Sequence, residues 1–248
     1  MIITSEEDLA ALKRIGRIVG LTIQEMARHL EPGIITAELD DIGRKFLDSH
    51  GARSAPEIVY TFPGATCISV NDQAAHGIPG PQIVQRGDLV NIDVSAELDG
   101  FFADSGASFT VPPVTPQAQL LVDSTREALH KALGVARAGL PIQMVGRLVE
   151  NFAKDRGFTI IRNLGGHGIG RKLHEEPSFI PHFYDRTEKR RFVDGTVLTI
   201  EPFLSNGATD VIEQADGWTL QTPNGELSAQ FEHTMVITRG KPILLTAV

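Results

Sequence analysis

The chain has little cysteine and no excess of positive charge. Only one of its 248 residues is cysteine (Cys67), so no disulfide bond can form within it. It carries 23 lysine and arginine residues against 31 aspartate and glutamate residues, for a formal net charge of −8. Because binding to phosphates needs clustered basic side chains, this balance argues against nucleic acids and anionic membranes as partners.

The chain also lacks long apolar segments. No stretch approaches the ~20 consecutive apolar residues that span a bilayer. The first residues, MIITSEEDLAALKR, lack the apolar core of a signal peptide. The hydrophobic content of 42% is nevertheless enough to bury a sizeable core. We therefore expect a soluble, cytoplasmic protein that binds neither nucleic acids nor membranes.

Helix signals occur in two pairs. Ser5, followed by three acidic residues, predicts the start of a first helix, and Thr36 can cap a second helix that ends at Gly51. Short strand-like pieces broken by glycine and proline are expected next, leading to a strong strand at DLVNIDV. In the later half, Thr115 followed by proline begins a long helix, and another is expected over residues 142–156.

The two halves of the chain resemble each other. Gly33 and Gly51 bracket the second expected helix and are 18 positions apart, as are Gly139 and Gly157 around the fourth. The strand sequences GDLVNID and GTVLTIE also match, each with an acid at the sixth position after the glycine. We interpret these matches as an internal duplication of helix–helix–strand units that share one sheet and one core.

A predicted hairpin brings two acids together. Asp99-Gly100 between two strand patterns is a strong signal for a two-residue turn. With that turn, Asp104 faces Ser95, which lies on the same side of its strand as Asp93. The two aspartates become diagonal neighbours about 7–8 Å apart at Cβ, close enough to share an ion.

Three further residues favour a metal site. Glu201 ends the strand that matches the one carrying Asp93, and Glu232 lies within another strand-like run, AQFEHTMVIT. Like charges brought together need a cation between them. His167, flanked by glycines in GGHGIG, adds a nitrogen ligand. One imidazole and four carboxylates suit two ions of Mn²⁺, Fe²⁺ or Co²⁺, and Zn²⁺ is not excluded.

Over essentially its whole length the sequence resembles the type I methionine aminopeptidases. The matching motifs are CISVND–HGIPG, NIDV, DGFFADS, GGHGIG–HEEP, TIEP and DGW–LSAQFEHT. The family's order of metal ligands is matched by Asp93, Asp104, His167, Glu201 and Glu232. The resemblance implies an α/β (α+β) pita-bread fold, with a curved, mostly antiparallel sheet. It would form a single catalytic domain with pseudo-symmetric halves at about residues 1–110 and 111–248.

The resemblance also implies a reaction. The family releases the N-terminal methionine from nascent polypeptides with a small second residue, by attack of a metal-bridging hydroxide. Glu201 would act as general base, His174 would donate a hydrogen bond to the developing oxyanion, and His76 would assist the leaving amine. Each histidine also has a purely structural interpretation, His76 as a loop residue and His174 as a cap for a turn.

A methionine pocket and a monovalent cation site are further implications of the resemblance. The residues that match the pocket are Phe62, Cys67, His76, Leu173, His174 and Trp218. The residues that match a site for Na⁺ or K⁺ are Asn71, Gln73 and Ser228. The chain departs from the commoner family pattern at Leu173, where many relatives have an aromatic residue, at Ala75, where many have cysteine, and across residues 56–64 (PEIVYTFPG).

Two alternative functions remain open. Xaa-Pro aminopeptidases and prolidases use a similar five-ligand site, usually with an added N-terminal domain. A non-catalytic binding module on the same fold would have lost metal ligands, and none is missing here. By the same resemblance we expect a monomer whose partners are nascent polypeptide N-termini, with transient ribosome association possible for the family.

Overall fold

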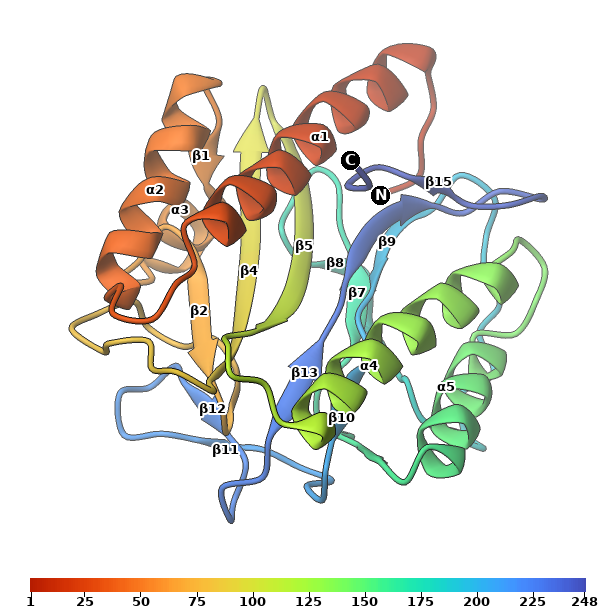
Figure 1. Cartoon of the computed structure of the whole chain (residues 1–248). Coiled ribbons are helices and arrows are strands. Elements are labelled where there is room, and N and C mark those ends of the chain that lie inside the picture. The colour runs from red at the N-terminus through yellow and green to blue at the C-terminus, as the bar shows by residue number, and fades with distance from the viewer.

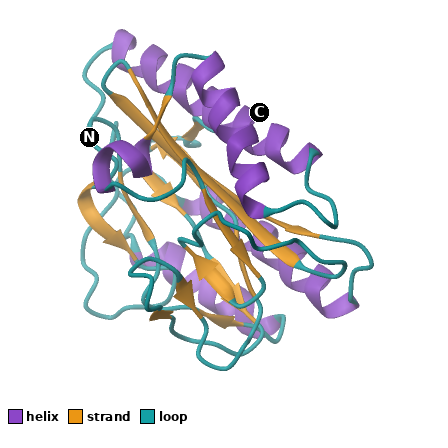
Figure 2. Ribbon diagram, turned by 90° about the vertical axis from the view of Figure 1, so that its left-hand side faces the viewer, coloured by secondary structure: helices purple, strands orange, loops and turns teal.

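Four long helices lie in two pairs against the strands (Figure 1). The computed structural model describes residues 1–248. The helix bounds are α1 (Glu6–Arg28), α2 (Thr36–Ser49), α4 (Pro116–Val135) and α5 (Gln143–Asp155). Figure 2 shows these helices along one side of the strands, with many of the loops on the other. None of the helices combines the length and the apolar character needed to cross a bilayer.

The helix ends follow the local sequence signals. The Ser5 hydroxyl accepts a hydrogen bond from the Asp8 amide at 3.1 Å, which caps α1. The Thr115 hydroxyl caps α4 in the same way, with proline in the first turn. The backbone agrees with the predicted duplication at two matching glycines. Gly51 follows α2 and Gly157 follows α5, and both have a positive φ (71° and 80°).

The longest hairpin has the predicted register. β4 (Leu89–Leu98) and β5 (Phe101–Thr110) are joined by Asp99 and Gly100, whose φ angles are 53° and 80°. Ser95 pairs with Asp104 across the hairpin. The sheet is completed by β1 (Arg53–Ser54) and β2 (Cys67–Val70), which both pair with β4.

A second, five-stranded sheet lies beside this hairpin, where the Asp104 amide of β5 donates to the Thr234 hydroxyl of β14. Its strand order is β15-β14-β9-β7-β8. Its strands are β7 (Gly166–Gly168), β8 (Glu175–Ile180), β9 (Val197–Ile200), β14 (His233–Val236) and β15 (Ile243–Leu244). One three-stranded sheet contains β13 (Ser228–Gln230), β10 (Phe203–Ser205) and β6 (Thr159–Ile160). Another contains β11 (Ile212–Glu213), β12 (Leu220–Gln221) and β3 (Gln73–Ala75). All of these pairings are antiparallel.

The hydrophobic core consists of two large clusters, one under each helix pair. The first includes Leu12 and Ile15 of α1 together with Ile92 of β4. The second packs Leu121 of α4 and Val149 of α5 against the strands of the later half. Burying each such side chain contributes roughly 1.5–3 kcal/mol. The two clusters therefore hold the strands between them in place, and those strands carry the site.

One element was not expected from the sequence. The segment after Gly51 was predicted to contain only short strand-like pieces, but it includes a short helix, α3 (Ala55–Tyr60). The Ser54 hydroxyl accepts a hydrogen bond from the Glu57 amide at 3.3 Å, and proline lies in the first turn. The β-branched residues of this segment favour a strand. The helix cap and the ion pair between Glu57 and Arg44 stabilise the helix against that preference.

Candidate metal centre and substrate cavity

A cavity of about 470 Å³ lies between the two halves of the chain. It is lined by all five predicted metal ligands, Asp93, Asp104, His167, Glu201 and Glu232. It is also lined by the six predicted pocket residues, Phe62, Cys67, His76, Leu173, His174 and Trp218. The structure therefore brings eleven sequence-predicted residues to one place, from positions 62 to 232.

Strand register explains how the four acids meet. In the hairpin, Asp93 pairs with Gly106 and Asp104 pairs with Ser95, so both carboxylates project from the same face. Glu201 directly follows β9, and Glu232 directly precedes β14. Because β9 and β14 are paired with Ile200 opposite His233, the two glutamates also lie side by side.

His167 is held in one tautomer. Its Nδ1–H donates to the carbonyl oxygen of Gly168 at 2.9 Å, which leaves the lone pair on Nε2. That nitrogen lies 3.8 Å from Asp104 Oδ2 and 3.9 Å from Glu201 Oε1. Its flanking glycines allow close backbone approach, since a Cβ on Gly168 would lie 2.3 Å from the Glu176 carbonyl oxygen. This is the arrangement expected of a metal-binding imidazole.

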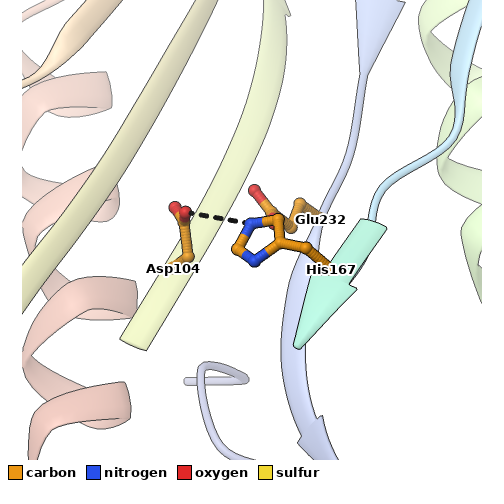
Figure 3. A group of neighbouring side chains, drawn as sticks. All are labelled: Asp104, His167 and Glu232. Carbon is orange, nitrogen blue, oxygen red and sulfur yellow. Dashed lines mark ion pairs between the residues drawn. The ribbon is translucent and has the colours of Figure 1, made fainter. Parts of the chain in front are cut away.

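Three of the ligands form a compact group (Figure 3). One ligand atom each from Asp104, His167 and Glu232 all lie within 4.8 Å of one another. Asp104 Oδ1 and Glu232 Oε1 are buried and have no hydrogen-bond partner in the protein. Unpaired buried oxygens of this kind are costly, and no lysine or arginine lines the cavity to compensate them. The residues present therefore fit bound cations.

The electrostatics of the protein without metal lead to the same conclusion. Burial raises the pKa of Asp93 to about 6. Burial and the neighbouring carboxylates also raise the pKa values of Asp104, Glu201 and Glu232 well above their usual range. Burial lowers the pKa of His167 to about 4, so its imidazole is neutral at pH 7 and can act as a ligand. Divalent cations would remove the repulsion among these acids.

Gln230 is a residue of the site that was not predicted. Its side-chain Nε2 lies 3.3 Å from Asp93 Oδ2, 3.3 Å from Glu201 Oε2 and 3.2 Å from Glu232 Oε2. Asn91 Nδ2 donates to Gln230 Oε1 at 2.8 Å, which turns the NH₂ group towards the acids. The sequence could have indicated this residue, because it lies two positions before Glu232 in a strand-like segment, and residues two apart in a strand project from the same face.

Two further polar residues support Glu201. The backbone N–H of Glu201 donates to His182 Nε2 at 3.1 Å, and the Thr199 hydroxyl donates to Glu201 Oε1 at 3.3 Å. His182 is buried, and burial lowers its pKa to about 3. Nothing in the spacing of the sequence distinguished His182 from the other histidines, because its partner is a backbone amide 19 residues away.

The part of the cavity beside the carboxylates has apolar walls. Phe62 and Trp218 meet edge to face with ring centroids 5.2 Å apart. Cys67 pairs with Asp93 in the β2–β4 register, and burial raises the pKa of its thiol, which keeps it neutral. Leu173 is buried against the first core cluster. Phe179 and Phe203, which were not predicted, also line the cavity.

The three residues predicted for a monovalent cation lie outside this cavity. The Ser228 amide donates to the Asn71 carbonyl oxygen at 3.4 Å, so these two are neighbours. The side-chain oxygens of Asn71 and Gln73 accept hydrogen bonds from the amides of Leu89 and Val70. The monovalent site stays a prediction.

The duplicated antiparallel fold and a cavity with four acids and one imidazole define a metal-dependent enzyme. The model of metallopeptidase family M24 matches residues 10–239 of the chain, and the chain belongs to this family. It is similar to methionine aminopeptidase 2 of Bacillus subtilis (strain 168), with 49% identity over 247 residues and 99% of each chain covered. The family assignment implies that the cavity binds divalent metal ions.

Solved structures agree with this assignment. The crystal structure of methionine aminopeptidase from Rickettsia prowazekii matches with a TM-score of 0.94 and 33% identity, and both chains are fully covered. The prolidase from Pyrococcus furiosus matches with a TM-score of 0.79 and 20% identity, and 66% of that chain is covered. The second likeness concerns the fold alone. The predicted pita-bread fold is confirmed.

Proposed function

We propose that the protein is a metal-dependent exopeptidase that releases the N-terminal methionine of polypeptides. The observation that carries this proposal is one cavity in which five ligands of metal-binding type adjoin an apolar pocket. A similarity of 49% identity along the whole chain to a named methionine aminopeptidase supports it. The prolidase-like alternative has only a shared fold at 20% identity in its favour.

We propose that Asp93, Asp104, His167, Glu201 and Glu232 hold two divalent ions. One nitrogen and several carboxylate oxygens suit Mn²⁺, Fe²⁺ or Co²⁺, and Zn²⁺ can also bind such a set. Divalent ions bound there would polarise the scissile carbonyl group and make water more acidic. The proton transfers and the binding of the methionine side chain would depend on the chain's own residues.

The chain's own residues would carry the proton transfers. The Glu201 carboxylate, held by the Thr199 hydroxyl and the Gln230 amide, would accept a proton from the attacking water and pass it to the leaving amine. His174 would donate an N–H to the carbonyl oxygen as negative charge develops on it. His76, also in the cavity wall, would hydrogen-bond near the scissile nitrogen.

The pocket accounts for the choice of methionine. Phe62, Trp218, Cys67 and Leu173 offer aromatic, sulfur and aliphatic contacts to a flexible thioether side chain. A volume of about 470 Å³ lies within the range of small-ligand sites, about 300–1,000 Å³. The cavity can therefore accommodate a methionyl side chain, and we expect the second residue of the substrate to be small.

The wider setting follows from the same proposal. We expect the substrates to be nascent polypeptide N-termini met in the cytoplasm, with the enzyme acting as a monomer that associates at most transiently with the ribosome. We also expect one catalytic domain with two related halves, and a Na⁺ or K⁺ ion near Asn71, Gln73 and Ser228.

The decisive experiment measures free methionine released from a Met-Gly-Met peptide. Activity should disappear with a chelator and return on separate addition of Mn²⁺, Fe²⁺, Co²⁺ or Zn²⁺. A Gly-Pro-Met peptide serves as the matched substrate for the proline-directed alternative. Cleavage of that peptide but not of Met-Gly-Met would refute the proposal, and so would undiminished activity after complete removal of metal.

A further inference from the structure

Tyr60 contacts His174, a proposed catalytic residue, and the sequence did not predict this contact. Its hydroxyl oxygen lies 2.6 Å from His174 Nδ1, and the two rings are 5.7 Å apart at their centroids. Tyr60 belongs to residues 56–64, the stretch that departs from the commoner family pattern. Both side chains line the cavity.

Short helix α3 holds this phenol in a defined place. Tyr60 is the last residue of α3, and Thr61 ends the helix with a left-handed φ of 59°. The first turn is anchored by the bidentate ion pair between Glu57 and Arg44 of α2, with N–O distances of 2.6 and 2.8 Å. The helix that carries Tyr60 is therefore anchored to α2, and its hydroxyl contacts His174 although the Tyr60 residue is 44% exposed.

The chemistry of the contact determines where the proton of His174 lies. A phenol hydroxyl can donate or accept a hydrogen bond, but its O–H is more acidic than an imidazole N–H, and an imidazole lone pair is a better acceptor than a phenol oxygen. Donation from the phenol to the imidazole nitrogen is therefore the stronger arrangement. When it donates to Nδ1, that nitrogen carries the lone pair, and the ring hydrogen of the neutral imidazole is on Nε2. Nε2 makes no hydrogen bond within the protein, so its N–H is left for a group bound in the cavity.

His167 provides the contrast. The rings of His167 and His174 are neighbours, with centroids 4.1 Å apart. At His167 the partner of Nδ1 is a carbonyl oxygen, which requires the hydrogen on Nδ1 and leaves a lone pair on Nε2. At His174 the partner of Nδ1 is a phenol hydroxyl, a better donor than the imidazole N–H, which favours the reverse. The partners of Nδ1 thus favour opposite tautomers for the two adjacent imidazoles, one suited to bind a cation and one suited to donate a hydrogen bond.

We propose that Tyr60 is a positioning residue that holds His174 as the Nε2–H tautomer, ready to donate to the carbonyl oxygen of the substrate. This inference rests on the proposed function and deepens it. Without the phenol, His174 can also adopt the Nδ1–H form, which presents a lone pair to the substrate instead of a donor. Tyr60 would therefore act on transition-state stabilisation through His174.

Nitrogen NMR of the zinc-loaded protein tests the tautomer directly. In the wild type, His174 should show a proton on Nε2 and none on Nδ1, whereas His167 should show the opposite. In Tyr60→Phe, which keeps the ring and removes the hydroxyl, the His174 signals should shift towards a mixture of tautomers. Tyr184→Phe is the matched control, because Tyr184 is the only other tyrosine and lies outside the cavity.

Kinetics separate positioning from substrate contact. Tyr60→Phe should lower kcat about five- to tenfold and change KM less than about twofold, because the lost hydrogen bond acts in the transition state. In a His174→Ala background the same change should have no further effect. Unchanged His174 spectra in Tyr60→Phe, or an additive loss in the double variant, would overturn the inference. If the wild type released no methionine the proposed function would fail, and the spectra would still decide the tautomer.

Discussion

The proposed metal centre and the proposed methionine pocket occupy one cavity but are built differently. All five proposed ligands lie in strands or directly beside them, and strand register determines their relative positions. Much of the pocket wall comes instead from loops and from the short helix α3, with Phe62 and Trp218 both outside regular elements. Ligands need fixed geometry, whereas an apolar slot tolerates variation in how its surface is supplied. The difference predicts that changes at the centre cost more than changes at the wall.

The largest effect should come from Glu201→Gln. The variant keeps the size of the side chain and removes the carboxylate that serves as ligand and base, so methionine release should fall by about 10²–10⁴-fold. The fold should persist, because a buried acid with a raised pKa is replaced by a neutral group. Glu31→Gln, at an exposed position between α1 and α2, is the control and should retain full activity. Equal activity in both variants would contradict the assigned role.

Metal affinity should respond to Gln230→Met. Removing the amide takes away the donor that three carboxylates share, and changes in groups that orient metal ligands typically weaken binding about 10–100-fold. Calorimetric titration with Mn²⁺ measures the change. The exposed Gln117→Met is the control variant. Unaltered affinity in Gln230→Met would show that the acids are positioned by their strands alone.

The pocket wall should give a smaller and different response. Trp218→Leu removes the edge-to-face contact with Phe62, and we expect KM for a Met-Gly-Met peptide to rise about tenfold while kcat changes little. Steady-state kinetics would decide the point. A loss confined to kcat would mean that this side chain acts on the chemistry and not on binding.

The smallest effect concerns pH and stability without metal. A carboxyl group whose pKa is raised in the folded state stabilises the fold while protonated and loses that contribution as pH rises through its folded pKa. For Asp93 the loss therefore runs from about pH 4 to about pH 6, and for the other three acids it extends higher. Buried histidines such as His167 and His182, whose pKa values are lowered, contribute the opposite slope between pH 5 and pH 7. The contribution of the acids is therefore measured by difference: relative to Glu201→Gln, the melting temperature of the chelated wild type should be several degrees lower at pH 8 than at pH 5.

Added divalent metal should reverse this trend. Binding requires ionised carboxylates, so the increase in melting temperature caused by Mn²⁺ should be larger at pH 8 than at pH 5. Thermal denaturation followed by circular dichroism at both values measures it. A difference in melting temperature between the chelated wild type and Glu201→Gln that is the same at pH 5 and pH 8 would be incompatible with repulsion among these acids.

The sequence could indicate that the proposed metal ligands lie together because its signals are local and repeated. Asp99-Gly100 specifies a turn whose register brings Asp93 and Asp104 together, and the duplicated strand pattern identifies Glu201 as the counterpart of Asp93. The helix caps at Ser5 and Thr115 were also predicted from the sequence. These features depend on neighbours within a few residues or on a repeat of the same pattern, and both are visible along one chain.

The tertiary structure alone decided what surrounds those ligands. Tyr60 and His174 are 114 positions apart, and Gln230 reaches Asp93 across 137. The helix that carries Tyr60 forms because a cap and an ion pair with α2 override β-branched residues. A contact between distant side chains depends on the packing of whole elements, which no spacing rule encodes. The order of the five ligands is thus a property of the sequence, and the tautomers and hydrogen bonds that prepare them are properties of the fold.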